Sequence, residues 1–279
     1  MKIIDARDIT QLIRAMCISA NIDADPAIRT HLEAIHEQER DGPAKNALGM
    51  IIENMDIATR ERLPMCQDTG QVVVFVELGQ NVHIKGNLSD AIHEGVRQGY
   101  KEGYLRASVV GDPLKRHNTQ DNTPAVIHYN VVPGSHLTID VLPKGTGAEN
   151  KSALTMLTPS QGLAGIEAFV LETVRKAGAS ACPPFFIGIG IGGTLEKAAL
   201  MSKQALALDI NHANPDPDWA TFERNMLTKI DELGIGAMGL KGNKTAMGVN
   251  VLTYPTHIGG LPVAVNISCH VSRHRSVTL

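Results

Sequence analysis

Three cysteines lie where a loop meets an expected strand, a position at which side chains often form binding sites. Cys66 precedes the apolar run 72–78, Cys182 precedes the run 185–191, and Cys269 follows the run 262–267. They stand 116 and 87 residues apart, so their spacing alone does not define a metal site. If the three thiolates converge, their soft sulfur suits zinc or an iron–sulfur cluster, and three ligands leave one metal position open for a substrate.

The fourth cysteine, Cys17, has a different setting. Apolar residues recur at helical spacing over residues 8–21, and Cys17 lies on that apolar stripe. We therefore expect Cys17 to be a packing residue. None of the four cysteines forms a Cys-x-x-Cys pair, which favours thiols in a reducing compartment over a disulfide framework.

Other polar groups lie close to these positions or in similar loops. Gln67 and Asp68 follow Cys66 directly, although an ordinary turn capped by Asp68 explains them equally well. Arg106 has the geometry to bind a carboxylate with two hydrogen bonds, but single arginines are more often solvated. The turn containing Gly145 and Gly147 offers backbone N–H groups to an anion, or is a plain connection to a helix.

Two further loops contain residues that could bind a ligand or take part in catalysis. His257 lies between a proline and two glycines, as in a loop that closes over a site, although lone loop histidines are commonly just exposed. The segment Gly188–Gly193 superficially resembles a dinucleotide phosphate loop, with Asp209 as a possible ribose ligand. The stretch before Asp209 is helical throughout, so no second strand ends in that acid, which weakens the nucleotide interpretation.

Helices and strands alternate along the chain, and together they must position these residues. Pro133–Ser135 predicts a hairpin turn between antiparallel strands at 125–132 and 137–142. Together with strands that alternate with helices, this predicts an α+β fold in which mixed, partly antiparallel sheets are flanked by helices. We expect a single domain over 1–279, helical over about 8–62 and carrying the three candidate ligand thiols over about 63–279. The remaining helices are predicted at 26–38, 43–62, 89–105, 159–176, 195–208 and 217–233.

Composition excludes several classes of protein. The chain has 279 residues, 43% of them hydrophobic and 20% charged, which suits a globular core. Its net charge of −3 gives no overall basic field, so we expect no nucleic-acid partner. No apolar run is long enough to span a bilayer, and the first ten residues do not resemble a signal peptide, so we expect no membrane partner and a cytoplasmic protein.

Seven motifs in a fixed order carry a family resemblance. From about residue 45 to the end, the chain resembles the α-type domain of class I fumarases and tartrate dehydratases, and most closely the separate α subunit of a two-subunit fumarase. The motifs are MCQDTG, LRAS, NTQDNTPAVIH, KGTGAENKSAL, CPPFFIGIGIGGTLEKAAL, GNKTAMGVNV and YPTHIGGLPVAVNISCH.

The resemblance implies roles for the candidate residues. Cys66, Cys182 and Cys269 would hold a [4Fe-4S] cluster with one iron not ligated by protein. Asp68 and His257 would be catalytic and would also contact a bound hydroxy-dicarboxylate. The other implied substrate-binding residues are Gln67, Arg106, Gly145 and Gly147.

The resemblance also implies an activity and a partner. The chain would be the α subunit of a hydro-lyase that interconverts fumarate and malate, acting only with a β-type subunit, in an α2β2 assembly, because the family's principal base and several cations lie in the β-type domain. The nearest alternative keeps the chemistry and changes the substrate to L-tartrate or another hydroxy-dicarboxylate. Alternatives of another class are a structural zinc module and a nucleotide-binding protein.

Overall fold

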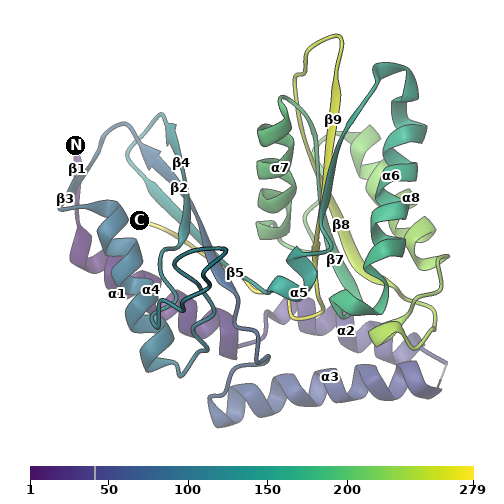
Figure 1. The fold of residues 1–279 in the computed structure, drawn as a ribbon, viewed down its shortest axis with the longest axis horizontal. Helices are drawn as coiled ribbons and strands as arrows, with labels where there is room; N and C mark the ends of the chain where they lie inside the picture. The colour runs from purple at the N-terminus through teal and green to yellow at the C-terminus, as the bar shows by residue number, and fades with distance from the viewer. Residues whose placement is uncertain (41) are drawn as a thin grey trace. The chain divides into compact units, whose positions relative to one another are not determined.

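The computed structural model describes residues 1–40 and 42–279. Helices are combined with sheets that contain both parallel and antiparallel strand pairs (Figure 1), which confirms the predicted α+β class. The chain divides into two compact units, each described separately below. That the whole chain is a single domain stays a prediction. Unit 1 comprises Met1–Asp25, Asn54–Thr146 and Arg273–Leu279, and unit 2 comprises Pro26–Glu53 and Gly147–Ser272.

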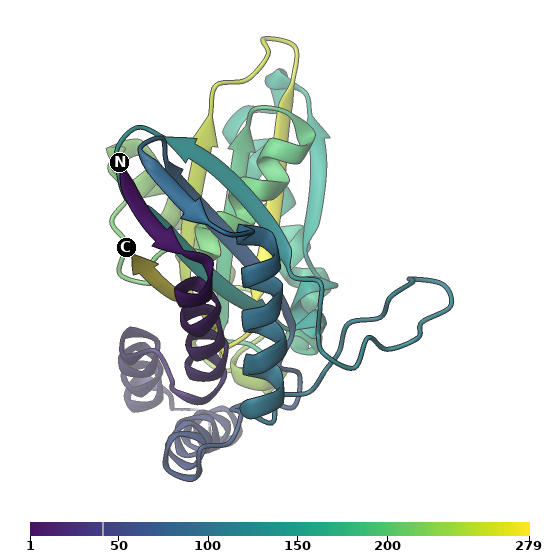
Figure 2. The ribbon, with the colours of Figure 1, turned by 90° about the vertical axis from the view of Figure 1, so that its left-hand side faces the viewer.

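Unit 1 contains a four-stranded sheet whose interior strand β2 carries five consecutive buried apolar residues, 72–76. Helices α1 and α4 lie side by side along this unit (Figure 2) and place their apolar stripes in its core. Helix α1 begins after Asp5, whose side chain accepts a hydrogen bond from the Arg7 N–H. The strand order is β10 (Arg275–Thr278), β5 (Leu137–Lys144), β2 (Gln71–Gly79) and β4 (Val126–Val132), and the helices are α1 (Ala6–Ile22) and α4 (Leu88–Glu102).

The predicted hairpin between β4 and β5 is wrong. Both strands exist, but β4 pairs in parallel with one side of β2 and β5 pairs antiparallel with its other side. The turn crosses the end of β2, where the Gly79 N–H donates to the carbonyl of His136. A Cβ at Gly79 would lie 2.7 Å from the carbonyl oxygens of Gly134 and His136, so the crossing requires glycine. Turn residues predict that the chain reverses, but the wider sheet decides which strands pair.

Short strands complete unit 1 and were not predicted from sequence. Strand β1 (Lys2–Asp5) pairs in parallel with β3 (Val82–Lys85), and β10 pairs with β5. Each has four residues, too few for alternation to stand out from its surroundings. The polar stretch after α4 contains no helix or named strand, as predicted.

Unit 2 is built on a second four-stranded sheet, in which β7 and β9 are the interior strands. Helix α7 packs against β7 and β9, while α6 packs against β9 and α8 against β8 on the opposite face (Figure 1). All eight residues of β7 are buried, as a strand covered on both faces requires. The strand order is β6 (Ala153–Leu157), β9 (Leu261–Ser268), β7 (Phe185–Gly192) and β8 (Ala246–Tyr254), and the helices are α6 (Gly162–Ala177), α7 (Leu195–Gln204) and α8 (Pro217–Asp231).

The glycines of β7 have a packing explanation. A Cβ at Gly188 would lie 2.1 Å from the carbonyl oxygen of Ser202, and one at Gly190 would lie 2.1 Å from that of Ala198. Both carbonyls belong to α7, so the glycines allow the helix backbone to rest directly on the strand. This close approach accounts for two of the four glycines in the pattern that resembles a nucleotide loop.

The remaining predicted helices follow their ranges within a few residues, whereas α5, β6, η2 and η4 were not predicted. Prolines open α2 and lie in the first turn of α3, as the sequence indicates. Among the described residues, no helix has the length and apolar character needed to cross a membrane. The elements not yet given bounds are α2 (Pro26–Gln38), α3 (Gly42–Glu61), α5 (Thr146–Glu149), and the 3-10 turns η1 (Pro159–Gln161), η2 (Gly178–Ala181), η3 (Ala205–Ala207) and η4 (Ala237–Gly239).

Candidate active site

The segment that carries Cys66, Gln67 and Asp68 joins α3 to β2 and is held by buried groups of unit 1. The Tyr100 hydroxyl, in a side chain only 2% exposed, donates to the carbonyl oxygens of Thr69 at 2.7 Å and Gly70 at 3.1 Å. Burial raises the pKa of Tyr100 well above its usual range, so the hydroxyl remains a donor. The backbone of this loop is therefore fixed.

Asp68 is oriented by two backbone N–H groups. Its Oδ1 accepts from the Gly70 N–H at 3.1 Å, and its Oδ2 accepts from the Thr146 N–H at 2.7 Å. A Cβ at Gly145 would lie 3.3 Å from Oδ2, so a larger residue would crowd the carboxylate. The glycine turn thus lies against Asp68, through the amide of Thr146. That Gly145 or Gly147 offers an N–H to a substrate stays a prediction.

The two other predicted substrate ligands of unit 1 are exposed. The Thr69 hydroxyl donates to the backbone carbonyl of Arg106 at 2.9 Å, which ties the Arg106 segment to the loop of Gln67 and Asp68. Gln67 and Arg106 both present exposed side chains. Gly147 belongs to unit 2, where the nearest atom to a Cβ built on it is the Ser180 carbonyl oxygen, 3.9 Å away.

In unit 2, the structure brings two of the predicted ligands together. Cys182 follows η2 in a left-handed conformation with φ of 54°, and its carbonyl oxygen accepts from the His270 backbone N–H at 3.2 Å. His270 Nδ1 lies 3.1 Å from the same oxygen, and because a carbonyl only accepts, Nδ1 carries the proton. Cys269, next to His270, is half-buried, as is Cys182.

Cys66 belongs to unit 1, whereas Cys182 and Cys269 belong to unit 2. Over residues 1–40 and 42–279, no group of three or more His, Cys, Asp or Glu side chains is assembled as a metal site. Cys17 is fully buried in the core of unit 1, and burial raises the pKa of its thiol to about 12. Its predicted packing role is confirmed.

His257 lies on the exposed loop between β8 and β9. Its Nδ1 accepts from the Gly259 N–H at 3.1 Å, so the neutral ring carries its proton on Nε2 and can donate outward. Strand β9 has eight residues, and a rise of about 3.4 Å per residue separates its ends by roughly 24 Å. Cys269 lies at the other end, so one copy of unit 2 does not bring His257 and Cys269 together.

Sequence reasoning missed Arg273. Its side chain is buried in unit 1 and only 3% exposed. Its Nη1 donates to the Asn21 Oδ1 at 2.8 Å and to the backbone carbonyl of Asp68 at 2.9 Å. The only sequence signal is the alternation of Arg273 and Arg275 beside a short strand, and arginine type alone does not distinguish a buried side chain from an exposed one.

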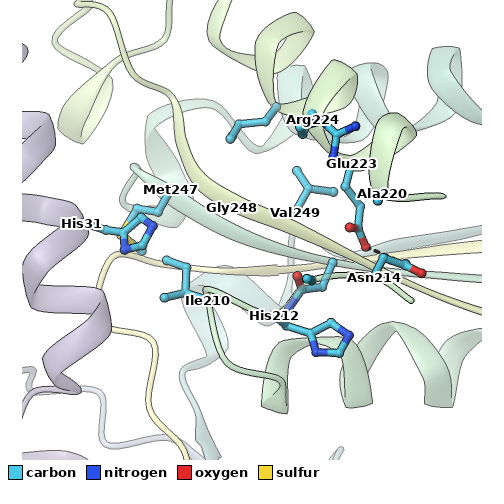
Figure 3. A pocket seen from close by; sticks show the side chains of 13 residues that line it. His31, Ile210, His212, Asn214, Ala220, Glu223, Arg224, Met247, Gly248 and Val249 are labelled. Carbon is cyan, nitrogen blue, oxygen red and sulfur yellow. Dashed lines mark hydrogen bonds between the residues drawn. The ribbon is translucent and has the colours of Figure 1, made fainter. Parts of the chain in front are cut away.

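A cavity of about 240 Å³ in unit 2 contains none of the predicted site residues (Figure 3). Glu223 at its edge accepts from the Asn214 Nδ2 at 2.9 Å and from the Val251 N–H at 2.7 Å. These bonds tie α8 and the preceding loop to β8, which gives the buried carboxylate a structural role.

The chain matches the fumarate hydratase (Fumerase) family over residues 10–278. It is 39% identical over 280 residues to the putative L(+)-tartrate dehydratase subunit alpha of Methanocaldococcus jannaschii, a match that covers 98% of this chain and 96% of that protein. It is 31% identical over 252 residues to the L(+)-tartrate dehydratase subunit alpha of Escherichia coli strain UTI89, covering 89% of this chain and 82% of that protein.

These matches define the class of protein: a chain of hydro-lyase type. It belongs to the fumarate hydratase (Fumerase) family, which confirms the resemblance found in the sequence.

Proposed function

We propose that the chain is the α subunit of a hydro-lyase that reversibly hydrates fumarate to malate. The observation that carries the proposal is the family match over residues 10–278. The oriented Asp68 carboxylate beside the Gly145 turn supports it, because a hydroxy-dicarboxylate needs a fixed polar group next to backbone donors. L-tartrate is the second candidate substrate, since the relatives reported above are named L(+)-tartrate dehydratase subunits.

A [4Fe-4S] cluster held by Cys66, Cys182 and Cys269 is part of the proposal. The donor chemistry fits, because all three thiols are half-buried rather than sealed in the core, and the backbones of Cys182 and His270 are hydrogen-bonded. An iron without a protein ligand would supply a Lewis acid for the substrate hydroxyl. Such a cluster needs a reducing compartment, in keeping with the predicted cytoplasmic location.

The chain's own residues then bind and orient the substrate. Arg106 binds one carboxylate with two N–H donors, and Gln67 adds an amide contact. Backbone N–H groups of the Gly145–Gly147 turn complete the anion site. Asp68, whose two oxygens already accept backbone N–H groups, retains lone pairs that can hold a proton: it accepts one from the adding water in the hydration direction and returns it to the leaving hydroxyl in the dehydration direction.

His257 keeps its proposed catalytic and substrate-binding role, with one addition. Because β9 separates its loop from Cys269, we propose that His257 serves the site of a second α chain. Its Nε2–H is then the donor to the substrate. An α2β2 assembly supplies the second chain.

A separate β subunit supplies the principal base and the remaining cations. The test is an anaerobic assay of the cluster-reconstituted α chain, alone and with its β partner, against malate, tartrate and a methylated malate. Activity only in the α/β pair supports the proposal, and the preferred substrate identifies the hydro-lyase. Robust dehydration by the α chain alone contradicts the need for a partner.

Metal analysis after anaerobic purification tests the cofactor separately. Iron and sulfide in equal amounts, with visible absorbance, support the cluster. Zinc without iron and sulfide would support a structural zinc module instead.

A further inference from the structure

We propose that Arg273 is the positioning residue for Asp68, fixing the loop so that the carboxylate faces the Gly145 turn. The inference rests on the proposed hydro-lyase function, because it assigns a role to Asp68 in that site. It concerns only side chains within unit 1.

The first observation is a chain of hydrogen bonds from α1 to Asp68. The Asn21 side chain, fully buried, donates from Nδ2 to the Cys17 carbonyl at 2.9 Å, which fixes its Oδ1. Arg273 Nη1 donates to that Oδ1 at 2.8 Å and to the Asp68 carbonyl at 2.9 Å. The Asn21 carbonyl also accepts from the Met65 N–H at 2.9 Å. The end of a rigid helix therefore sets the position of the Asp68 backbone.

The second observation is that the guanidinium and the carboxylate both border the position of Gly145. A Cβ built on Gly145 would lie 3.2 Å from Arg273 Nη2 and 3.3 Å from Asp68 Oδ2. The two charged groups therefore border the same small space, which the absence of a side chain at Gly145 leaves open. The positive charge of Arg273 attracts the Asp68 carboxylate toward that space.

The third observation is an unsatisfied donor. Arg273 Nε is buried and has no hydrogen-bond partner among the described residues. Buried polar groups are normally paired, so a guanidinium kept in this state calls for an explanation. A buried charge with an unpaired N–H costs desolvation free energy and contributes little to the stability of the fold. A role in holding Asp68 for chemistry explains why the position carries arginine rather than an apolar residue.

Arg275 supplies a matched control. It lies two residues further on in the same unit, and its Nη2 donates to the carbonyls of Ser19 at 3.1 Å and Asp23 at 2.6 Å. It thus stabilises the end of α1 without an observed contact to Asp68. Arg275→Gln should lower the melting temperature without affecting the position of Asp68.

The kinetic experiment compares Arg273→Gln, Arg273→Lys and Arg275→Gln in the reconstituted α/β enzyme at equal iron and sulfide content. Arg273→Gln should lower kcat about 100-fold with a much smaller change in KM, since small misplacements of a catalytic group have costs of that size. Arg273→Lys should recover part of kcat, because a lysine ammonium can donate to the Asp68 carbonyl. It lacks the second terminal nitrogen of the guanidinium, so the recovery should be incomplete. Arg275→Gln should keep kcat near the wild-type value.

A second measurement on the full α chain does not depend on activity. Hydrogen exchange at the Gly70 and Thr146 amides, which donate to Asp68, should accelerate in Arg273→Gln but not in Arg275→Gln. Unchanged protection in Arg273→Gln, or an unchanged kcat, overturns the inference. If the wild-type enzyme dehydrates no hydroxy-dicarboxylate, the proposed function fails, and the exchange comparison still decides whether Arg273 holds Asp68.

Discussion

The carbonyl oxygen of Cys182 accepts two hydrogen bonds from His270, one from its backbone N–H at 3.2 Å and one from its Nδ1–H at 3.1 Å. Two loops 88 residues apart are therefore joined at the position of two predicted cluster ligands. Because Cys182 takes part through its backbone, replacing its side chain leaves this connection in place.

Removal of the Cys182 thiol should remove the cluster and spare the fold. Cys182→Ser is nearly isosteric, so we expect loss of the visible iron–sulfur absorbance with little change in far-ultraviolet circular dichroism. Cys17→Ala is the control: it should keep the absorbance and lose about 1 kcal/mol or more of stability through the cavity it leaves. A full cluster in Cys182→Ser would reject its assignment as a ligand.

Glycine in β7 should be required for stability rather than for nucleotide binding. Gly190→Ala places a Cβ 2.1 Å from the Ala198 carbonyl oxygen and should cost about 3 kcal/mol or more in the free energy of unfolding. In Gly111→Ala the nearest atom is 3.8 Å away, so the cost should stay within about 0.5 kcal/mol. Thermal unfolding measures both. A dinucleotide should leave the wild-type melting temperature unchanged, and a clear rise would revive the nucleotide interpretation.

Asp121 should make part of the stability of unit 1 dependent on pH. Burial raises the pKa of its carboxyl, but hydrogen bonds from Thr123 and Arg97 outweigh that effect and lower the pKa from 3.8 to about 2. The stabilisation is therefore complete above pH 4 or so and is lost as the pH falls through about 2. Asp121→Asn should cost about 1 kcal/mol at pH 7, allowing for solvent screening of a partly exposed group, and less near pH 2. Urea unfolding at several pH values checks this, and a cost that does not vary with pH argues against it.

Action of His257 on a second chain predicts complementation. Asp68→Asn and His257→Ala should each inactivate the α/β enzyme when present in every α chain. In a mixed α pair, one site keeps its own Asp68 and receives His257 from the other chain, so random mixing should restore about a quarter of the wild-type activity. Differently tagged α chains allow the mixed pairs to be isolated. Isolated mixed pairs with no activity would show that His257 does not act across chains.

Local sequence patterns predicted most helices and the longer strands. The apolar stripe around Cys17 and the prolines at the starts of α2 and α3 act within a few residues, which explains why those boundaries agree with the structure. Pairing between strands depends on distant segments. The turn at Pro133–Ser135 did not reveal that β2 would lie between β4 and β5.

The same distinction applies to the candidate site: groupings of sequence neighbours were predicted, and contacts between distant residues were not. Residues in one motif, such as Gln67 and Asp68, were found together because they are neighbours in sequence. The contact of Asp68 with the Thr146 amide joins residues 78 positions apart. Arg273 was missed for this reason, since its partners Asn21 and Asp68 are 252 and 205 positions away.

The division of unit 1 into three stretches of chain has a consequence for biosynthesis. Its first two stretches emerge from the ribosome long before Arg273–Leu279, with most of unit 2 made in between. Until β10 arrives, β5 presents an open edge and the Asp68 loop lacks its guanidinium. Closure of this unit is therefore a late, non-local step, and slow closure of that kind leaves nascent strands open to wrong pairing and in need of chaperone protection.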